Sequence, residues 1–152
     1  MCIIIGKLPG VEFPPYSVLD QCDTANRDGM GIAYTKDGMV RIKKDFARVY
    51  DLNRFIIEEL SPSMGALIHF RIGTAGNKDI GNRHPFPITR RRKRLRAPES
   101  VTDMALAHNG TLEDLKGHKK YSDTLLFIRD VLSDPIVRNN LHSVAIHELV
   151  AG

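Results

Sequence analysis

The chain opens with Met-Cys-Ile-Ile-Ile-Gly, in which three consecutive β-branched residues, Ile3 to Ile5, end at Gly6. Such a run is typical of a buried strand, and we expect a central strand of a sheet. Removal of the initiator methionine would leave Cys2 with both a thiol and a free α-amine, which could act as general base. Cys2 is therefore a candidate nucleophile. The alternative is a small buried residue, as free cysteines often are.

The composition is that of one globular domain. The chain has 152 residues, of which 42% are hydrophobic and 26% are charged, which suffices for a single core. No apolar run approaches the roughly 20 residues of a membrane span, so we expect no membrane segment and a cytoplasmic location. Cys2 and Cys22 form neither a metal-binding spacing nor a disulfide framework, and the histidines show no ligand spacing, so we expect no metal and no cofactor.

Positive charge is concentrated in the basic run, residues 90–96. The formal net charge of the chain is +4, but this run holds six arginines and lysines, so the remainder is mildly acidic. We weigh two interpretations: a solvated loop between strands, or a contact for nucleic acid, a phosphorylated molecule or another anionic partner. No aromatic residue is interleaved with the run, which argues against stacking on single-stranded nucleic acid.

The predicted elements come in a mixed order. An Asp-Gly pair at positions 37 and 38 separates the strand-like segments 29–34 and 39–42 and predicts a hairpin. Further strands are expected at 65–71, 85–88 and 104–108. Helices are expected at 17–25, with Val18, Cys22 and Ala25 on the packed face, at 51–60, capped by Asp51, at 122–132 and at 137–150. Because strands and helices do not alternate regularly, we expect an α+β fold.

Polar residues suited to an amide substrate occur near predicted strand and helix ends. Asn109 and Gly110 could stabilise an oxyanion through a side-chain amide and a backbone N–H, although Asn-Gly is also a common turn. Arg71 precedes a glycine-rich loop and could pair with a substrate carboxylate or with an acid of the protein. Asp123 could bind an ammonium group, cap a helix, or do both. One arginine and one aspartate are the minimum needed to bind both the carboxylate and the ammonium group of an α-amino acid.

The order of these motifs resembles that of class II glutamine amidotransferases, the N-terminal-nucleophile glutaminase domains of enzymes such as glucosamine-6-phosphate synthase, glutamine phosphoribosylpyrophosphate amidotransferase and asparagine synthetase. The resemblance extends from Cys2 to about Asp130. The motifs that carry it are Met1-Cys2, Asp-Gly-Met-Gly at 28–31, His-Phe-Arg-Ile-Gly-Thr-Ala-Gly at 69–76, His-Pro-Phe at 84–86, Ala-His-Asn-Gly at 107–110 and Ser-Asp-Thr at 122–124. The resemblance implies a four-layer αββα sandwich, forming a single domain over residues 1–152 that lacks the C-terminal strands of the family.

The resemblance also implies a reaction. Cys2 would attack the side-chain carboxamide of glutamine, and Asn109 and Gly110 would form the oxyanion hole. Ammonia would leave, and water would hydrolyse the resulting thioester to glutamate. The ammonia would pass to an acceptor enzyme on another chain or in a missing C-terminal region.

Substrate contacts are implied in the same way. Arg71 would hold the α-carboxylate of glutamine and Asp123 its α-ammonium group. The pocket would be lined by Thr74, Gly76 and His84. Ile72 stands where some members of the family have an aromatic residue, and a retained Met1 would bury the amine in a peptide bond and remove the base.

Two other functions stay open at this point. One is a catalytically silent fold that serves as a binding module and uses the basic run to contact nucleic acid or a protein partner. The other keeps the N-terminal nucleophile but acts on a different amide. Ammonia release from glutamine separates both from the glutaminase interpretation.

Overall fold

The computed structural model describes residues 1–73, 77–115 and 119–143. These residues form an α+β fold built on a five-stranded antiparallel sheet with strand order β1-β4-β2-β3-β6. Its strands are β1 (Ile3–Lys7), β2 (Met30–Lys36), β3 (Met39–Lys43), β4 (Ala66–Phe70) and β6 (Glu99–Thr102). Two short strands, β5 (Phe86–Pro87) and β7 (Ala105–Leu106), form a separate antiparallel pair.

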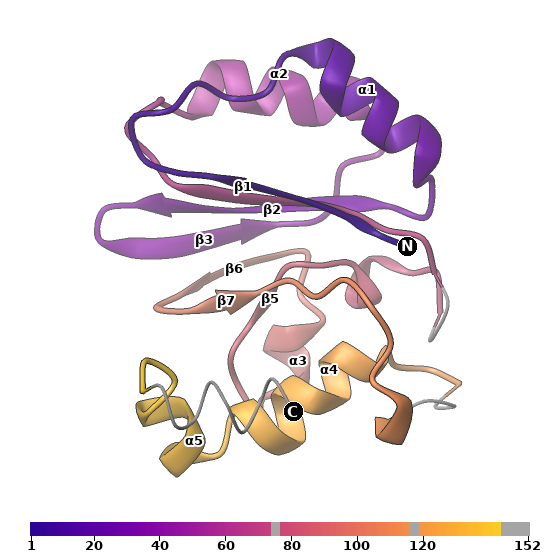
Figure 1. Cartoon of the computed structure of the whole chain (residues 1–152), viewed down its shortest axis with the longest axis vertical. Helices are drawn as coiled ribbons and strands as arrows, with labels where there is room; N and C mark the ends of the chain where they lie inside the picture. The colour runs from indigo at the N-terminus through magenta and orange to yellow at the C-terminus, as the bar shows by residue number, and fades with distance from the viewer. Residues whose placement is uncertain (74–76, 116–118, 144–152) are drawn as a thin grey trace.

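The elements are stacked in layers, as Figure 1 shows. Helices α1 (Tyr16–Ala25) and α2 (Val49–Glu59) cover one face of the five-stranded sheet. The β5–β7 pair lies on the other side of that sheet. Beyond it lie α3 (Arg92–Leu95), α4 (Asp123–Phe127), a π-helical turn (Ile128–Leu132) and α5 (Pro135–Asn139). No helix within the described ranges is long and apolar enough to cross a membrane.

Two hydrophobic cores hold these layers together. The first joins the five-stranded sheet to α1 and α2 and includes Leu19, Ile32, Leu52, Ile68 and Phe70. The second lies among the β5–β7 pair and the helices beyond it and includes Phe86, Leu95, Leu125, Ile128 and Leu132. Burying each such side chain contributes about 1.5–3 kcal/mol to folding.

The predicted hairpin is confirmed. Lys36 pairs with Met39, which leaves Asp37 and Gly38 as a two-residue loop. Both loop residues have positive φ angles, 54° and 72°, as a type I′ turn requires. The hairpin places β2 in the middle of the sheet, between β4 and β3.

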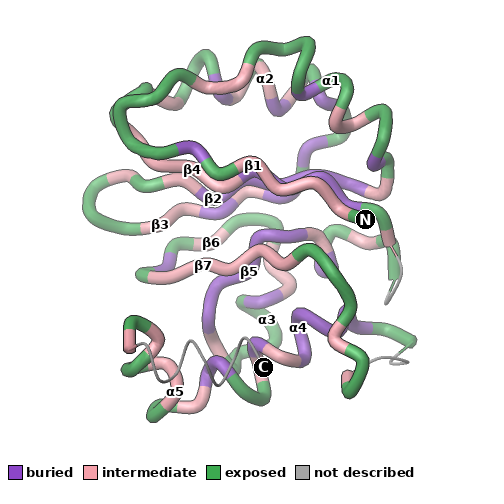
Figure 2. Tube along the Cα trace, viewed as in Figure 1, coloured by how far each residue is buried: buried purple, intermediate pink, exposed green. Residues whose placement is uncertain are grey.

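The prediction of a central strand at Ile3 to Ile5 is wrong, because β1 lies at an edge of the sheet and pairs with β4. All three isoleucines are partly buried, as the pink tube of β1 in Figure 2 shows. A β-branched run suits such a half-buried strand as well as a central one. The edge position leaves the N-terminus beside the end of β4.

The predicted start and packed face of α1 also need correction. The helix begins at Tyr16 and has no side-chain cap. Leu19 is its buried residue and Cys22 packs partly against the same core, whereas Val18 is exposed. Ala25, the third residue of the predicted face, is exposed as well. The packed face is therefore centred on Leu19 and Cys22, which are three residues apart.

Helix α2 overlaps the predicted helix but begins two residues earlier, ends one residue earlier and has a different cap. Arg48, not Asp51, occupies the N-cap position. Asp51 stands in the first turn and accepts a hydrogen bond from the Arg48 backbone N–H at 3.1 Å. A carboxylate there satisfies a backbone donor that the helix start leaves without a partner.

The last predicted helix, 137–150, is shorter within the described residues. Asp134 caps α5, which begins at Pro135 and ends at Asn139. The positions from 144 onward lie outside the described residues. The basic run is not a plain loop: part of it forms α3, because Leu95 is fully buried in the second core.

Candidate functional site

Cys2 lies just before β1, beside the residues that follow β4. In the antiparallel register Ile3 is opposite Phe70. The Ile72 backbone N–H donates to Cys2 Sγ at 3.4 Å, and the thiol lies 3.6 Å from the Ile72 carbonyl oxygen. Cys2 is partly exposed, so its sulfur is not sealed in the core. A backbone N–H at this distance can stabilise negative charge on sulfur, the form in which cysteine is a nucleophile.

Asn26 fastens the N-terminus to the sheet. Its side chain is buried, and Nδ2 donates to the Met1 carbonyl at 2.9 Å and to the Phe70 carbonyl at 3.2 Å. The sequence analysis missed this residue. The available signal was a polar residue at the end of a predicted helix, two residues before the Asp-Gly-Met-Gly motif at 28–31.

Arg71 is the most buried arginine near Cys2, with 3% of its surface exposed. Its Nη1 donates to the Asn77 carbonyl at 3.0 Å. Burial lowers the pKa of the Arg71 guanidinium, and the nearby charge of Asp28 acts in the opposite direction. The guanidinium is thus held at the end of β4, next to the residues that contact Cys2.

Asp28 organises the start of the glycine-rich loop. It pairs with Lys78 at 2.8 Å and accepts a hydrogen bond from the Gly73 backbone N–H at 2.7 Å. These two contacts, of which the one with Lys78 has the larger effect, hold the pKa of the Asp28 carboxyl below its usual value. The predicted pocket residues Thr74 and Gly76, in the same loop, lie outside the described residues.

Three histidines meet between the five-stranded sheet and the β5–β7 pair. The ring centroids of His69, on β4, and His84 are 4.3 Å apart. The His108 backbone N–H donates to His84 Nδ1 at 3.3 Å, and His108 Nδ1 lies 3.3 Å from Thr124 Oγ1. Burial lowers the pKa of His84 well below its usual value, so this imidazole is neutral and carries its proton on Nε2. Its predicted contact with substrate stays a prediction.

His69 makes the stability of the fold sensitive to acid. The residue is fully buried, and burial lowers its pKa from 6.5 to about 4. Between these pH values the unfolded chain binds the proton and the folded chain does not. We expect His69 to lower the free energy of unfolding by about 3 kcal/mol as the pH drops from 6.5 toward 4. His84, whose pKa burial also lowers, adds to this loss.

Urea unfolding at several pH values measures this loss. A His69→Leu variant should show a shallower pH dependence than the parent, because position 69 no longer titrates. The same substitution at the exposed His142 is the matched control and should leave the pH dependence unchanged. Parallel curves for the parent and His69→Leu would contradict the assignment.

Asp123 braces the segment that carries Asn109 and Gly110. It is buried, Oδ2 accepts from the Leu112 backbone N–H at 2.8 Å, and Oδ1 accepts from the Thr124 N–H at 2.8 Å. The N-cap of α4 is Ser122, whose side chain accepts from the Leu125 N–H. Asp123 therefore occupies the first helical position without being the cap, so its predicted capping role is wrong.

Asn109 and Gly110 lie in an exposed segment after β7. Gly110 has a φ angle of +149°, in the region that favours glycine, and a side chain there would meet the His108 ring at 3.2 Å. The Asn109 amide has no hydrogen-bond partner among the residues that the structure describes, and it is exposed. Its predicted role as an oxyanion donor stays a prediction.

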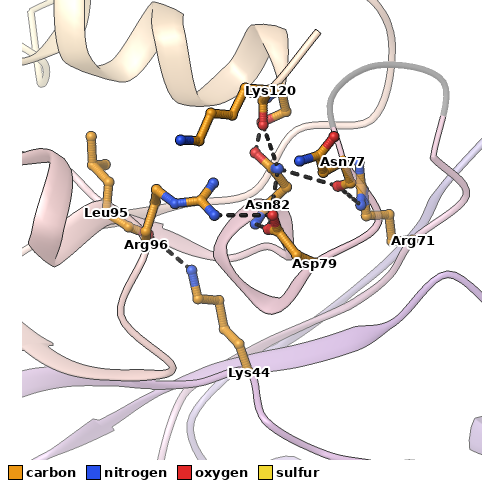
Figure 3. Close-up of polar contacts among 9 residues, drawn as sticks. Lys44, Arg71, Asn77, Asp79, Asn82, Leu95, Arg96 and Lys120 are labelled. Carbon is orange, nitrogen blue, oxygen red and sulfur yellow. Dashed lines mark hydrogen bonds and ion pairs between the residues drawn. The ribbon is translucent and has the colours of Figure 1, made fainter.

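Asn82 lies between the Arg71 region and Lys120, as Figure 3 shows. Its Nδ2 donates to the carbonyls of Asn77, at 3.1 Å, and Lys120, at 2.9 Å. Its Oδ1 accepts from the Ser122 N–H at 3.0 Å. One fully buried side chain therefore fixes the loop after β4 against the start of α4. The sequence analysis missed this residue too.

Lys44 ties the basic run to the five-stranded sheet. Its fully buried Nζ donates to the Leu95 carbonyl at 2.9 Å (Figure 3). Burial, with the nearby charge of Arg96 as a further cause, lowers the pKa of Lys44 to about 7. Arg96 in turn pairs with Asp79 at 3.0 Å. These contacts fix the far end of the basic run.

The predicted site residues thus fall into two neighbouring groups. Cys2 and Arg71 lie at the β1–β4 end, whereas Asn109, Gly110 and Asp123 lie between β7 and α4. The histidine contacts and Asn82 join the two groups. Within the described ranges, no three His, Cys, Asp or Glu side chains gather in a way that could hold a metal ion.

Such an arrangement can combine a nucleophilic sulfur with cationic, anionic and amide groups. Comparison of the chain with protein-family models, with curated proteins and with solved structures finds no match.

Proposed function

We propose that this chain is a glutaminase that uses Cys2 as an N-terminal nucleophile. The observation that carries the proposal is the partly exposed Cys2 thiol beside a buried arginine, at the ends of two paired strands. The layer order of helices, sheet, sheet and helices in Figure 1 supports the αββα sandwich that this class of enzyme uses. The motif order from Cys2 to the start of α4 supports it as well.

The proposed reaction begins when Met1 is removed. The free α-amine of Cys2 takes the thiol proton, and sulfur attacks the carboxamide carbon of glutamine. The Asn109 amide and the Gly110 N–H stabilise the oxyanion. The amine then protonates the departing nitrogen, ammonia leaves and a thioester remains. Water attacks the thioester, its proton goes to the amine, and sulfur is released with glutamate.

The chemistry of Arg71 and Asp123 suits the two charged groups of the substrate. Asp123 Oδ1 accepts from the Thr124 N–H and from the Thr124 hydroxyl, and Oδ2 accepts from the Leu112 N–H. Among these described contacts, Oδ2 keeps a further lone pair that can accept from an ammonium group. A guanidinium can bind a carboxylate with two parallel N–H groups, so Arg71 suits the α-carboxylate. Released ammonia would serve an acceptor enzyme, either in trans or in a C-terminal region beyond these residues.

Ammonia release by Met1-processed protein tests the proposal. We expect equal amounts of ammonia and glutamate from glutamine, with loss of Met1 visible by mass spectrometry. A protein with Gly-Ser inserted between Met1 and Cys2 is the matched control. It keeps the thiol but has a peptide nitrogen at Cys2, so its turnover should fall to background.

Three outcomes would contradict parts of the proposal. Equal turnover by the extended protein would exclude the amine as base. Faster ammonia release from asparagine or another amide would favour a different substrate. No ammonia from any amide with Met1-processed protein would favour a silent binding module.

A further inference from the structure

The basic run lines a second cleft, away from Cys2. A cavity of about 600 Å³ lies among the segment after β5, the start of α3, β6 and α5. Its polar lining includes Thr89, Arg90, Arg91, Arg94, Ser133 and Arg138. Small-molecule sites typically have volumes of about 300–1,000 Å³. The size of the cleft therefore suits a small ligand.

Positive charge exceeds negative charge in this cleft. Arg138 pairs with Asp103 at 2.6 Å, and Arg90 pairs with Asp134 at 3.0 Å. Arg94 donates to the Val101 carbonyl, and Arg91 is exposed. Among the described residues, neither Arg91 nor Arg94 has a carboxylate partner. The guanidinium groups of Arg91 and Arg94 therefore remain for an incoming anion. Those of Arg90 and Arg138 lie beside them, and their carboxylate partners fix their orientation.

Ser133 is a buried polar group that lacks a partner in the described part of the chain. Its side chain borders the cleft, 7% of the residue is exposed, and its Oγ has no hydrogen-bond partner. A buried hydroxyl without a partner costs free energy unless something supplies one. A ligand oxygen in the cleft would supply it once the Ser133 side chain rotates toward the cleft, because Oγ is shielded in the unliganded structure.

The other walls argue for a small organic anion. Met39 and Val101 are partly exposed apolar side chains on the cleft wall and can contact carbon atoms. The lining contains no aromatic residue, and single-stranded nucleic acid is usually held by aromatic stacking. Guanidinium groups match the geometry of phosphate oxygens through paired N–H donors.

We propose that this cleft binds a small phosphate monoester, with the phosphate on Arg91, Arg94 and the Ser133 hydroxyl and the carbon portion against Met39 and Val101. The site is separate from the proposed glutaminase site and does not depend on it. Binding can therefore be measured without glutamine and on protein that carries Cys2→Ala.

Calorimetric titration with glycerol 3-phosphate and with inorganic phosphate tests this site. We expect saturable one-to-one binding, tighter for the ester. Arg91→Ala and Arg94→Ala should each weaken it by about tenfold or more, since a charged hydrogen bond contributes about 1.5–3 kcal/mol. Ser133→Ala should weaken it about fivefold or more while the protein stays folded. The matched control is Lys93→Ala, in the same helix but outside the cleft, which should change affinity less than twofold.

Three results would overturn the proposal. They are absence of saturable binding by both probes, equal weakening by Lys93→Ala and Arg91→Ala, and unchanged affinity in Ser133→Ala. Titration with single-stranded oligonucleotides of increasing length tests nucleic acid as the alternative ligand. Affinity that grows with length and exceeds that for the ester would assign the surface to nucleic acid instead.

Discussion

Replacing Cys2 with alanine is expected to lower glutamine turnover by about 10³-fold or more, because the proposed thioester cannot form without sulfur. The change should fall on kcat, since Arg71 and Asp123, the proposed substrate contacts, are untouched. Ammonia production by purified, Met1-processed protein is the measurement. Folding should be nearly unaffected, because Cys2 is only partly buried and its described contacts are with the Ile72 backbone.

Cys22→Ala is the matched control, since it removes the other sulfur of the chain. Cys22 packs against the core under α1, and burial raises the pKa of its thiol, which disfavours the nucleophilic thiolate. We expect ammonia production to be retained in this variant. Turnover that survives Cys2→Ala, or that is lost in Cys22→Ala with the fold intact, would remove Cys2 as the nucleophile.

A Gly31→Ala variant is expected to lose about 3 kcal/mol of unfolding free energy. A β-carbon at Gly31 would lie 2.2 Å from the His84 carbonyl oxygen and 3.2 Å from that of Lys43. Backbone atoms cannot rotate away, so β2 or the segment before β5 has to shift, and overpacking of this kind typically costs about 1–3 kcal/mol. Urea unfolding at pH 7.5 measures the loss.

Gly6→Ala is the matched control on β1. A β-carbon there meets no atom within 4 Å, and alanine restricts the unfolded chain more than glycine does. The expected effect is a gain of about 0.5–1 kcal/mol or less. A similar loss in both variants would indicate a general intolerance of the strands to alanine, and would contradict the close approach of Gly31 to His84.

Features set by neighbouring residues could be predicted from the sequence. The Asp37-Gly38 turn is one, because its dihedral angles follow from residue type. The approximate extent of α2 is another, because its apolar spacing is local. The strand before Arg71 was also found, and the acid at position 123 does open α4.

Features set by distant contacts could not be predicted in this way. The edge position of β1 depends on pairing with β4, and β6 was missed because its short sequence alternates weakly and gains its place by pairing with β3. Asn26 and Asn82 each bond to backbone about 40 residues away, so no local pattern identifies their partners. Whether Asn109 serves Cys2 stays a prediction, because that role depends on bound substrate.

The two acceptors of Asn26 have a consequence for maturation of the N-terminus. Cleavage after Met1 removes one carbonyl, yet the Phe70 carbonyl remains as partner to the same nitrogen. When the first residue departs, one N–H of the Asn26 amide loses its acceptor and is left beside the new N-terminus, while the other keeps the end of α1 attached to β4. The precursor and the trimmed protein thus share one scaffold, so processing can switch on the proposed chemistry at position 2 without refolding what surrounds it.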